Sequence, residues 1–261
     1  PAPDMSGAFR PVMLAHPLIA KKDRDDPDAI NPDMITPEAF AAEWKWDGIR
    51  VQAVSENGVR RLYTRTGDDI SHTFPDVVAA MEFDAVLDGE LLVRKPDGNV
   101  APFNDLQQRL NRKTVSKKML SERPAFIRAY DILHHGEEDL RALTFRERRT
   151  KLEALLGTSP TDRFDVSPLV EVTDAASLNA LRNAPPQPEI EGLMLKRWES
   201  TYEAGRPKGP WFKWKRDPFL IDAVIMYAQR GHGRRSGYFS DFTFGVWAET
   251  DGGHEITPVG K

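Results

Sequence analysis

The chain contains no cysteine among its 261 residues. Disulfide bonds and cysteine-bearing zinc sites are therefore excluded, and the absence is typical of a protein from a reducing cytoplasm. Long apolar runs are also lacking, since none approaches the ~20 residues that span a bilayer. The first residues lack the charged and then apolar pattern of a signal peptide. We therefore expect a soluble protein that works inside the cell, away from membranes.

An overall excess of positive charge is missing too, because the net charge is −4 and the pI is near 5.9. This balance argues against a protein that coats nucleic acid through bulk charge. From Lys196 to Arg235, however, ten basic residues stand against four acidic ones, a local charge of +6. Aromatic residues are interleaved with these charges and favour a binding groove over an ordinary solvated surface. They are Tyr202, Trp211, Phe212, Trp214 and Tyr238.

The composition, 40% hydrophobic and 29% charged, is typical of a folded protein. A length of 261 residues suits two unequal domains. Strand-like and helix-like segments do not alternate strictly, so the pattern predicts an α+β fold rather than a doubly wound sheet. The expected boundary is at Arg216-Asp217-Pro218, where the character of the sequence changes.

Local patterns place the elements. Residues 44–52, 59–65 and 85–94 are strand-like, with hairpin turns at 56–58 and 95–98, and the second hairpin leads to a partner strand after Val100. Helical spacing appears at 75–81, 105–112, 145–156 and 175–181, with Thr144 as an N-cap. Residues 21–26 have the charges of an exposed loop.

The segment Glu43-Trp44-Lys45-Trp46-Asp47-Gly48-Ile49-Arg50 places one lysine among aromatic residues, before an Asp-Gly turn. A lysine with an ordinary pKa of about 10.4 is almost fully protonated near pH 7, so a nucleophilic lysine needs burial or a nearby positive charge. Partial burial of Lys45 between Trp44 and Trp46, together with a nearby positive charge, would meet this requirement. The alternative is an ordinary strand in which Lys45 is solvated.

Five further segments follow Lys45-Trp46-Asp47-Gly48 in a fixed order: 64–67 (TRTG), 87–91 (LDGEL), 129–133 (AYDIL), 191–196 (EGLMLK) and 211–215 (WFKWK). The series resembles the ATP-dependent DNA ligases, which are covalent nucleotidyltransferases related to RNA ligases and mRNA-capping enzymes. The resemblance runs from about Val12 to about Trp247. Six ordered motifs are far more specific than a single Lys-x-Asp-Gly match.

The resemblance implies three steps. Lys45 attacks the α-phosphate of ATP, AMP passes from the lysine to a DNA 5′-phosphate, and a 3′-hydroxyl displaces AMP to seal the nick. The substrate is nicked double-stranded DNA, and the protein is expected to be a monomer. Lys213 and Lys215 occupy alternate positions, so a strand would direct both to one face. Their implied role is to hold the α-phosphate, and their charge would lower the pKa of Lys45.

The resemblance also implies the nucleotide contacts. Glu43 is expected near the adenine amino group, Arg50 and Arg65 at the ribose and phosphates, and Lys196 at the nucleotide. Arg109 matches another active-site arginine, although Arg112 is an alternative and either fits the polar face of a helix. Tyr130 takes the place of an aromatic residue that stacks on adenine, the alternative being a core tyrosine.

Two carboxylates complete the expected site. Glu90 and Glu191 each lie beside a glycine in an apolar strand, where an inward carboxylate is costly unless it is paired or bound to metal. The resemblance places both near the nucleotide and a metal ion, with Glu90 also near the ribose. Mg²⁺ (or Mn²⁺) is the expected ion, because magnesium prefers few carboxylates together with phosphate oxygens. Asp47 and Asp88 are expected in turns and hydrogen-bond networks.

The resemblance implies an adenylation (nucleotidyltransferase) domain of antiparallel sheets flanked by helices over residues 1–217. An incomplete OB-fold barrel then covers residues 218–261. An OB-fold needs five strands, whereas residues 221–229 and 242–248 with the tail supply two or three. The chain starts at Pro1 without a methionine and lacks the family's last basic motif. We therefore expect a fragment, with residues 9–15 resembling the segment that follows an N-terminal DNA-binding domain.

Two other functions compete with a DNA ligase: an RNA ligase or capping-type enzyme, and a non-catalytic module that binds nicks. A binding module would need the basic groove but not Glu90 and Glu191 beside Lys45, Lys213 and Lys215. The residues at 206–209 and 11–14 favour DNA as the substrate.

Overall fold

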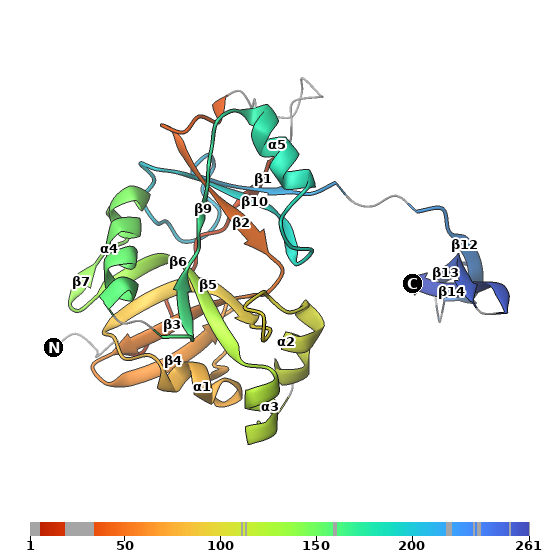
Figure 1. Cartoon of the computed structure of the whole chain (residues 1–261), viewed down its shortest axis with the longest axis horizontal. Coiled ribbons are helices and arrows are strands. Elements are labelled where there is room, and N and C mark those ends of the chain that lie inside the picture. Colours follow the sequence, from red (N-terminus) through yellow and green to blue (C-terminus); the bar gives the residue numbers. More distant parts are fainter. Residues whose placement is uncertain are drawn as a thin grey trace. The chain divides into compact units, whose positions relative to one another are not determined.

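The computed structural model describes residues 6–18, 34–110, 112, 114–158, 161–217, 221–231, 233, 236–250 and 252–260 (Figure 1). The chain divides into two compact units, Pro1–Arg216 and Asp217–Lys261. The loop predicted at 21–26 lies outside the described residues. In the part of the chain that the structure describes, no helix is long and apolar enough to cross a bilayer.

The first sheet of the larger unit contains five strands. Their order is β1 (His16–Pro17), β11 (Trp211–Lys215), β10 (Ile190–Arg197), β2 (Phe40–Trp46) and β9 (Leu169–Val170). All neighbours are antiparallel except the short pair of β1 with β11. Helix α5 (Ala175–Asn183) lies beside this sheet (Figure 1).

Alternation along these strands separates two environments, because successive side chains of a strand point to opposite faces. Apolar residues of β2, β10 and β11 form one core with Leu178 of α5, and they include Phe40, Leu193, Leu195 and Phe212. The residues between them, such as Glu43, Lys45, Met194 and Lys213, line a cavity on the opposite face. The WFKWK alternation therefore places Lys213 as predicted.

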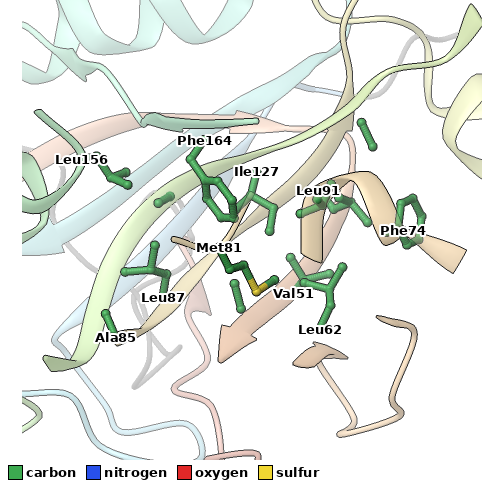
Figure 2. Packing of buried hydrophobic residues seen from close by; sticks show 14 of the residues in the cluster. Val51, Leu62, Phe74, Met81, Ala85, Leu87, Leu91, Ile127, Leu156 and Phe164 are labelled. Atoms are coloured by element: carbon green, nitrogen blue, oxygen red, sulfur yellow. The ribbon is translucent and has the colours of Figure 1, made fainter. Parts of the chain in front are cut away.

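The second sheet runs β4 (Val59–Thr64), β3 (Ile49–Glu56), β5 (Ala85–Val93), β6 (Ala125–His135) and β7 (Glu138–Asp139), and β8 (Phe164–Val166) pairs in parallel with β6. Val51, Leu87, Leu91 and Ile127 lie on its core face (Figure 2). Leu62, Phe74, Met81 and Phe164 pack into the same core (Figure 2). Alternate residues of β3, β5 and β6, including Arg50, Glu90 and Tyr130, line the cavity instead.

Five α-helices and one described 3-10 turn accompany these sheets in the described residues. They are η2 (Ser71–Thr73), α1 (Pro75–Ala79), α2 (Phe103–Leu110), α3 (Lys117–Glu122), α4 (Phe145–Thr158) and α5. The predicted cap of α4 is confirmed as a reciprocal capping box: Thr144 N donates to Glu147 Oε2 over 2.8 Å, and Glu147 N donates to Thr144 Oγ1 over 3.3 Å. The α+β class is confirmed, and α3 was not predicted.

The single strand predicted over residues 44–52 is wrong. The chain breaks at Asp47-Gly48 into β2 and β3, which belong to different sheets. Gly48 makes this crossing possible because a Cβ there would lie 2.6 Å from Leu91 O and 2.8 Å from Glu90 Cγ. Lys45 and Arg50 therefore reach one cavity from two sheets.

The two predicted hairpins have different outcomes. The turn at Asn57-Gly58 is confirmed, with positive φ angles of 49° and 79° that suit a type I′ turn. The turn after β5 also forms, as Lys95 N donates to Asn99 O over 2.8 Å, but pairing ends at the isolated Arg94–Val100 bridge, where Ala101 N donates to Val93 O over 2.8 Å. The predicted partner strand after Val100 is wrong because β3 and β6 already occupy both edges of β5.

The smaller unit is a three-stranded antiparallel sheet in its described residues, β12 (Val224–Arg230), β13 (Phe239–Thr250) and β14 (Gly253–Gly260). The predicted strands at 221–229 and 242–248 correspond to β12 and β13. Large apolar side chains remain exposed on this unit, including Tyr227, Tyr238 and Trp247.

Candidate active site

A cavity of about 450 Å³ opens in the larger unit and is lined from both sheets. Its size falls within the range of small-molecule sites. Six basic and two acidic side chains line it: Lys45, Arg50, Arg65, Lys196, Arg206, Lys213, Glu43 and Glu90. This imbalance favours an anionic ligand. Tyr130, Trp211 and Met194 supply apolar wall.

Lys45 lies at the end of β2, where its Nζ contacts Glu191 Oε2 at 2.7 Å. Lys215 Nζ approaches the same carboxylate oxygen at 3.2 Å. Burial raises the pKa of Glu191, but the hydrogen bonds and charges of Lys45 and Lys215 together hold the pKa below its ordinary value. Glu191 therefore stays ionised beside the candidate nucleophile.

A bulge in β10 directs Glu191 toward Lys45. The register of β10 against β2 shifts between Ile190, opposite Trp46, and Gly192, opposite Lys45. A bulge adds a residue to one strand and re-aims its side chain. Gly192 has φ 149°, and a Cβ there would collide with the backbone of Trp214. Glycine is thus required beside Glu191.

Arg50 is fixed by a buried carboxylate on the neighbouring strand. Its Nε and Nη2 donate to Asp88 over 3.0 Å and 2.6 Å, and Tyr202 Oη donates to Asp88 over 2.7 Å. Asp88 is fully buried within β5, so it is a network residue but not a turn residue. Burial opposes the charge of Arg50, yet Asp88 raises its pKa well above the ordinary value.

Glu43 and Lys196 form a buried ion pair at the wall of the cavity, with 2.5 Å between Oε2 and Nζ. The Lys196 ammonium lies 4.5 Å, 4.8 Å and 4.7 Å from the ring centroids of Tyr130, Phe145 and Trp211. Such contacts stabilise a desolvated cation by about 2 kcal/mol. Lys196 is therefore held firmly beside Glu43.

Several cations surround Lys213. Partial burial lowers the pKa of Lys213, and the charges of Arg206, Lys215, Lys45 and Arg65 lower it further. Arg65 lies in a loop where Asp68 accepts hydrogen bonds from Thr66 Oγ1 at 2.6 Å and Thr64 Oγ1 at 3.1 Å. Clustered cations repel one another, and binding of an anion such as phosphate relieves this repulsion.

Tyr130 lines the cavity from β6, beside both Lys196 and Arg50. Burial raises its pKa well above the ordinary value, with Arg50 opposing that change. The phenol is therefore neutral and presents an aromatic surface to the cavity. This position is compatible with stacking on a base, the role that the resemblance implies.

Glu90 faces Arg50 across β3 and β5. Burial raises its pKa from 4.5 to about 8, although Lys45 and Arg50 act in the opposite direction. Without a ligand, Glu90 is thus largely protonated near neutral pH.

This raised pKa predicts how stability depends on pH. Between pH 4.5 and 8 the folded chain binds the Glu90 proton more tightly than the unfolded chain, so the free energy of unfolding falls as pH rises, by up to about 1.4 kcal/mol per pH unit. Glu90→Gln should flatten that slope. Urea titrations of both proteins from pH 5 to 8 measure it, and parallel curves would contradict the placement of Glu90.

Among the described residues, no group of three or more His, Asp or Glu is arranged to hold a metal ion by itself. Glu90 and Glu191 nevertheless both act electrostatically on the Lys45 region, and each is the kind of oxygen donor that magnesium accepts. Glu90 and Glu191 therefore fit a site in which a magnesium ion is bound by two carboxylates and by phosphate oxygens.

Arg109 requires a correction. It does not line the cavity, and its buried guanidinium donates to Asp76 over 2.6 Å and 3.1 Å and to Thr73 O over 3.1 Å. It shares the buried face of α2 with Leu106. Arg109 thus joins α2 to α1 and does not reach the cavity. Arg112, the alternative, is exposed and donates to Gln108 O.

The structure adds residues that the motifs did not indicate. Arg206 lines the cavity from a loop, where no strand or helix periodicity reveals its direction. Arg149 of α4 contacts Glu43 over 3.1 Å from outside the sheet. A basic helix residue gives no sequence signal for such a contact. Glu191 and Lys215 do not line the cavity itself but are linked to Lys45 as described.

Residues 17–215 match the family model described as ATP dependent DNA ligase domain. A probable DNA ligase of Koribacter versatilis (strain Ellin345) is 32% identical over 254 residues, covering 86% of this chain and 43% of that protein. A DNA ligase of Halorubrum lacusprofundi is 34% identical over 247 residues, covering 86% of this chain and 40% of that protein. The chain thus spans less than half the length of these relatives.

Solved structures agree with this match. The ligase domain from M. tuberculosis LigD is 25% identical, with a TM-score of 0.60 over 96% of this chain and 72% of that one. A mycobacterial DNA ligase D complexed with ATP and MES is 24% identical, with a TM-score of 0.63 over 96% and 72% of the two chains. The second likeness shows the fold alone.

Proposed function

The chain belongs to the family of ATP-dependent DNA ligase domains, and we propose that it is the catalytic core of a DNA ligase that seals nicks through a lysyl-AMP intermediate. The observation that carries this proposal is Lys45, held 2.7 Å from Glu191 at a cavity otherwise dominated by positive charge. A lysine nucleophile beside a phosphate-binding cluster is what covalent nucleotidyl transfer requires.

In the first step, Lys45 Nζ forms a bond to the α-phosphorus of ATP while the bond to the β-phosphate oxygen breaks. Pyrophosphate leaves, and Nζ gives up two protons to solvent, one that frees the amine from the ammonium and one as the bond to phosphorus forms. The chain's own contribution is to position the reactants and to neutralise charge. Positive charge where the phosphates would lie comes from Lys213, Arg65 and Arg206. These cations repel one another, so binding of the phosphates would relieve their repulsion.

Glu191 has two roles in the proposed mechanism, one toward Lys45 and one toward the metal ion. It holds the Lys45 ammonium in place before ATP binds, through the contact at 2.7 Å. Glu90 and Glu191 would hold Mg²⁺ together with phosphate oxygens, and the ion would offset charge that develops on those oxygens. Asp88 keeps Arg50 directed into the cavity, where it would contact the nucleotide.

In the later steps, AMP passes from Lys45 to the 5′-phosphate at a DNA nick, and the 3′-hydroxyl then attacks that phosphorus and releases AMP. The substrate we propose is nicked double-stranded DNA. We propose that the protein binds it as a monomer, in the compartment that holds the cell's DNA. The basic residues after Lys196 support an interaction with the phosphate backbone.

We assign residues 1–217 to an adenylation domain and residues 218–261 to part of an OB-fold barrel. The strands β12 to β14 support this assignment, because they form one antiparallel sheet. Exposed apolar side chains such as Tyr227, Phe239 and Trp247 are those that further barrel strands would cover.

Nick sealing tests the proposal. Duplex DNA with one labelled 5′-phosphate at a nick is expected to give a longer labelled strand with ATP and Mg²⁺, measured on a denaturing gel. An RNA duplex of the same sequence serves as the comparison, and GTP replaces ATP in a parallel series. Faster sealing of the RNA nick, or equal use of GTP, would contradict an ATP-dependent DNA ligase.

A further inference from the structure

Glu43 is buried and is contacted by two cations from different elements. Its side chain is only 2% exposed, with Oε2 at 2.5 Å from Lys196 Nζ and Oε1 accepting from Arg149 Nη1 over 3.1 Å. Charge-assisted contacts of this kind are strong and directional. A carboxylate held by two cations offers only acceptor oxygens to a ligand.

Arg149 reaches Glu43 from helix α4. Its side chain is 7% exposed, and its Nε donates to Glu153 Oε1 over 2.5 Å, so the guanidinium bridges two carboxylates. The helix itself is fixed by the Thr144–Glu147 capping box and by burial of Phe145 and Leu152. Arg149 does not line the cavity, so any effect on a ligand must pass through Glu43.

The position of Glu43 relative to Lys45 connects the Arg149–Glu43 contact to nucleotide binding. The two residues lie two positions apart on β2 and line the same cavity, so their Cα atoms are separated by about 7 Å along the strand. In a nucleotide whose α-phosphate lies at Lys45, the ribose separates the base from that phosphate, so the base lies farther from Lys45. Glu43, Tyr130 and Met194 line the cavity where that base would fit.

We propose that Arg149 is a positioning residue for base selection. By fixing Glu43 as an acceptor, it favours a purine with an amino group at position 6 and disfavours one with an oxygen there. This inference rests on the proposed function, since it concerns the nucleotide that Lys45 receives. Unfavourable pairing of two acceptors is an effective means of rejecting the wrong ligand.

The test measures a ratio within one sample. Wild type and variants are incubated with equal concentrations of ATP and GTP and with Mg²⁺, and intact mass gives the ratio of AMP to GMP adducts. Partial unfolding removes both adducts equally, so the ratio reports selection alone. Arg149→Met is expected to lower the ratio about tenfold, whereas Arg149→Lys should restore most of it.

Two further samples sharpen the result. Glu153→Gln is the matched control, because it removes the exposed partner of Arg149 and leaves Glu43 paired, so its ratio should equal that of the wild type. Inosine triphosphate, which has the oxygen at position 6 but no 2-amino group, should gain in Arg149→Met as GTP does. A gain for GTP alone would assign selection to the 2-amino group and overturn the proposal.

The remaining outcomes separate the two claims. A wild type that is labelled by ATP, with an unchanged ratio in Arg149→Met, would overturn the role of Arg149 and leave the proposed function intact. A lower melting temperature with that unchanged ratio would identify Arg149 as purely structural. A wild type that takes no nucleotide onto Lys45 would overturn the proposed function and this inference together.

Discussion

Replacing Lys45 with arginine is expected to abolish covalent labelling by ATP, by several orders of magnitude, while leaving the fold intact. The guanidinium keeps the positive charge that pairs with Glu191, 2.7 Å from Lys45 in the native chain. It stays protonated at every accessible pH, so it provides no free amine to attack phosphorus. Labelling is measured with ATP radioactive at the α-phosphate, followed by denaturing electrophoresis.

The matched control for this variant is Lys95→Arg. Lys95 also pairs with a glutamate, Glu189 at 3.4 Å, but it does not line the cavity. Its replacement should leave labelling unchanged. Equal labelling of Lys45→Arg and wild type would show that another residue carries the nucleotide, and it would remove the basis of the proposed mechanism.

Replacing Asp88 with alanine should cause the largest loss of stability of the changes considered. Asp88 is fully buried and accepts hydrogen bonds from both Arg50 and Tyr202. Its removal leaves Arg50 buried without its carboxylate, which typically costs 3–5 kcal/mol. For a unit of this size, we expect the melting temperature to fall by about 10 °C.

Asp139→Ala provides the contrast. Asp139 also accepts from Arg141 with both oxygens, at 2.9 Å and 2.6 Å, yet its side chain is 46% exposed. Exposed pairs of this kind contribute about 0–1 kcal/mol. Differential scanning calorimetry of the two variants compares the same chemistry at two depths. A similar small loss in both would contradict the buried network around Arg50.

Local features of the fold were predictable wherever short-range chemistry decides them. The Asn57-Gly58 turn follows from two residues that adopt positive φ, and the start of α4 follows from Thr144 and Glu147. The alternation of lysines at Lys213 and Lys215 gave the strand and its cavity-facing side. Each of these depends on residues close in sequence.

Features that depend on distant strands were not predictable in the same way. The division between β2 and β3 depends on Gly48 lying against Leu91, and the failed hairpin after β5 depends on strands already paired on both sides. Local patterns contain neither fact. The bulge that turns Glu191 toward Lys45 likewise depends on a distant strand, because the register of β10 shifts against β2.

For the candidate site, the ordered motifs contain most of the residues that line the cavity. The resemblance implies that these distant motifs come together, which their spacing in the sequence does not show by itself. Arg109 shows the limit of this approach. The resemblance implied that Arg109 contacts the nucleotide, but its position on the buried face of α2 directs it to Asp76. Arg149 and Arg206 show the converse, since tertiary contacts place them near the site without a motif.

The most direct test of Lys45 as the nucleophile is the intact mass of the purified chain before and after incubation with ATP and Mg²⁺, and again after addition of pyrophosphate. We expect the mass to increase by one AMP, peptide mapping to locate AMP on Lys45, and pyrophosphate to remove it. No adduct, or an adduct on another residue, would contradict the assignment of Lys45 as the nucleophile.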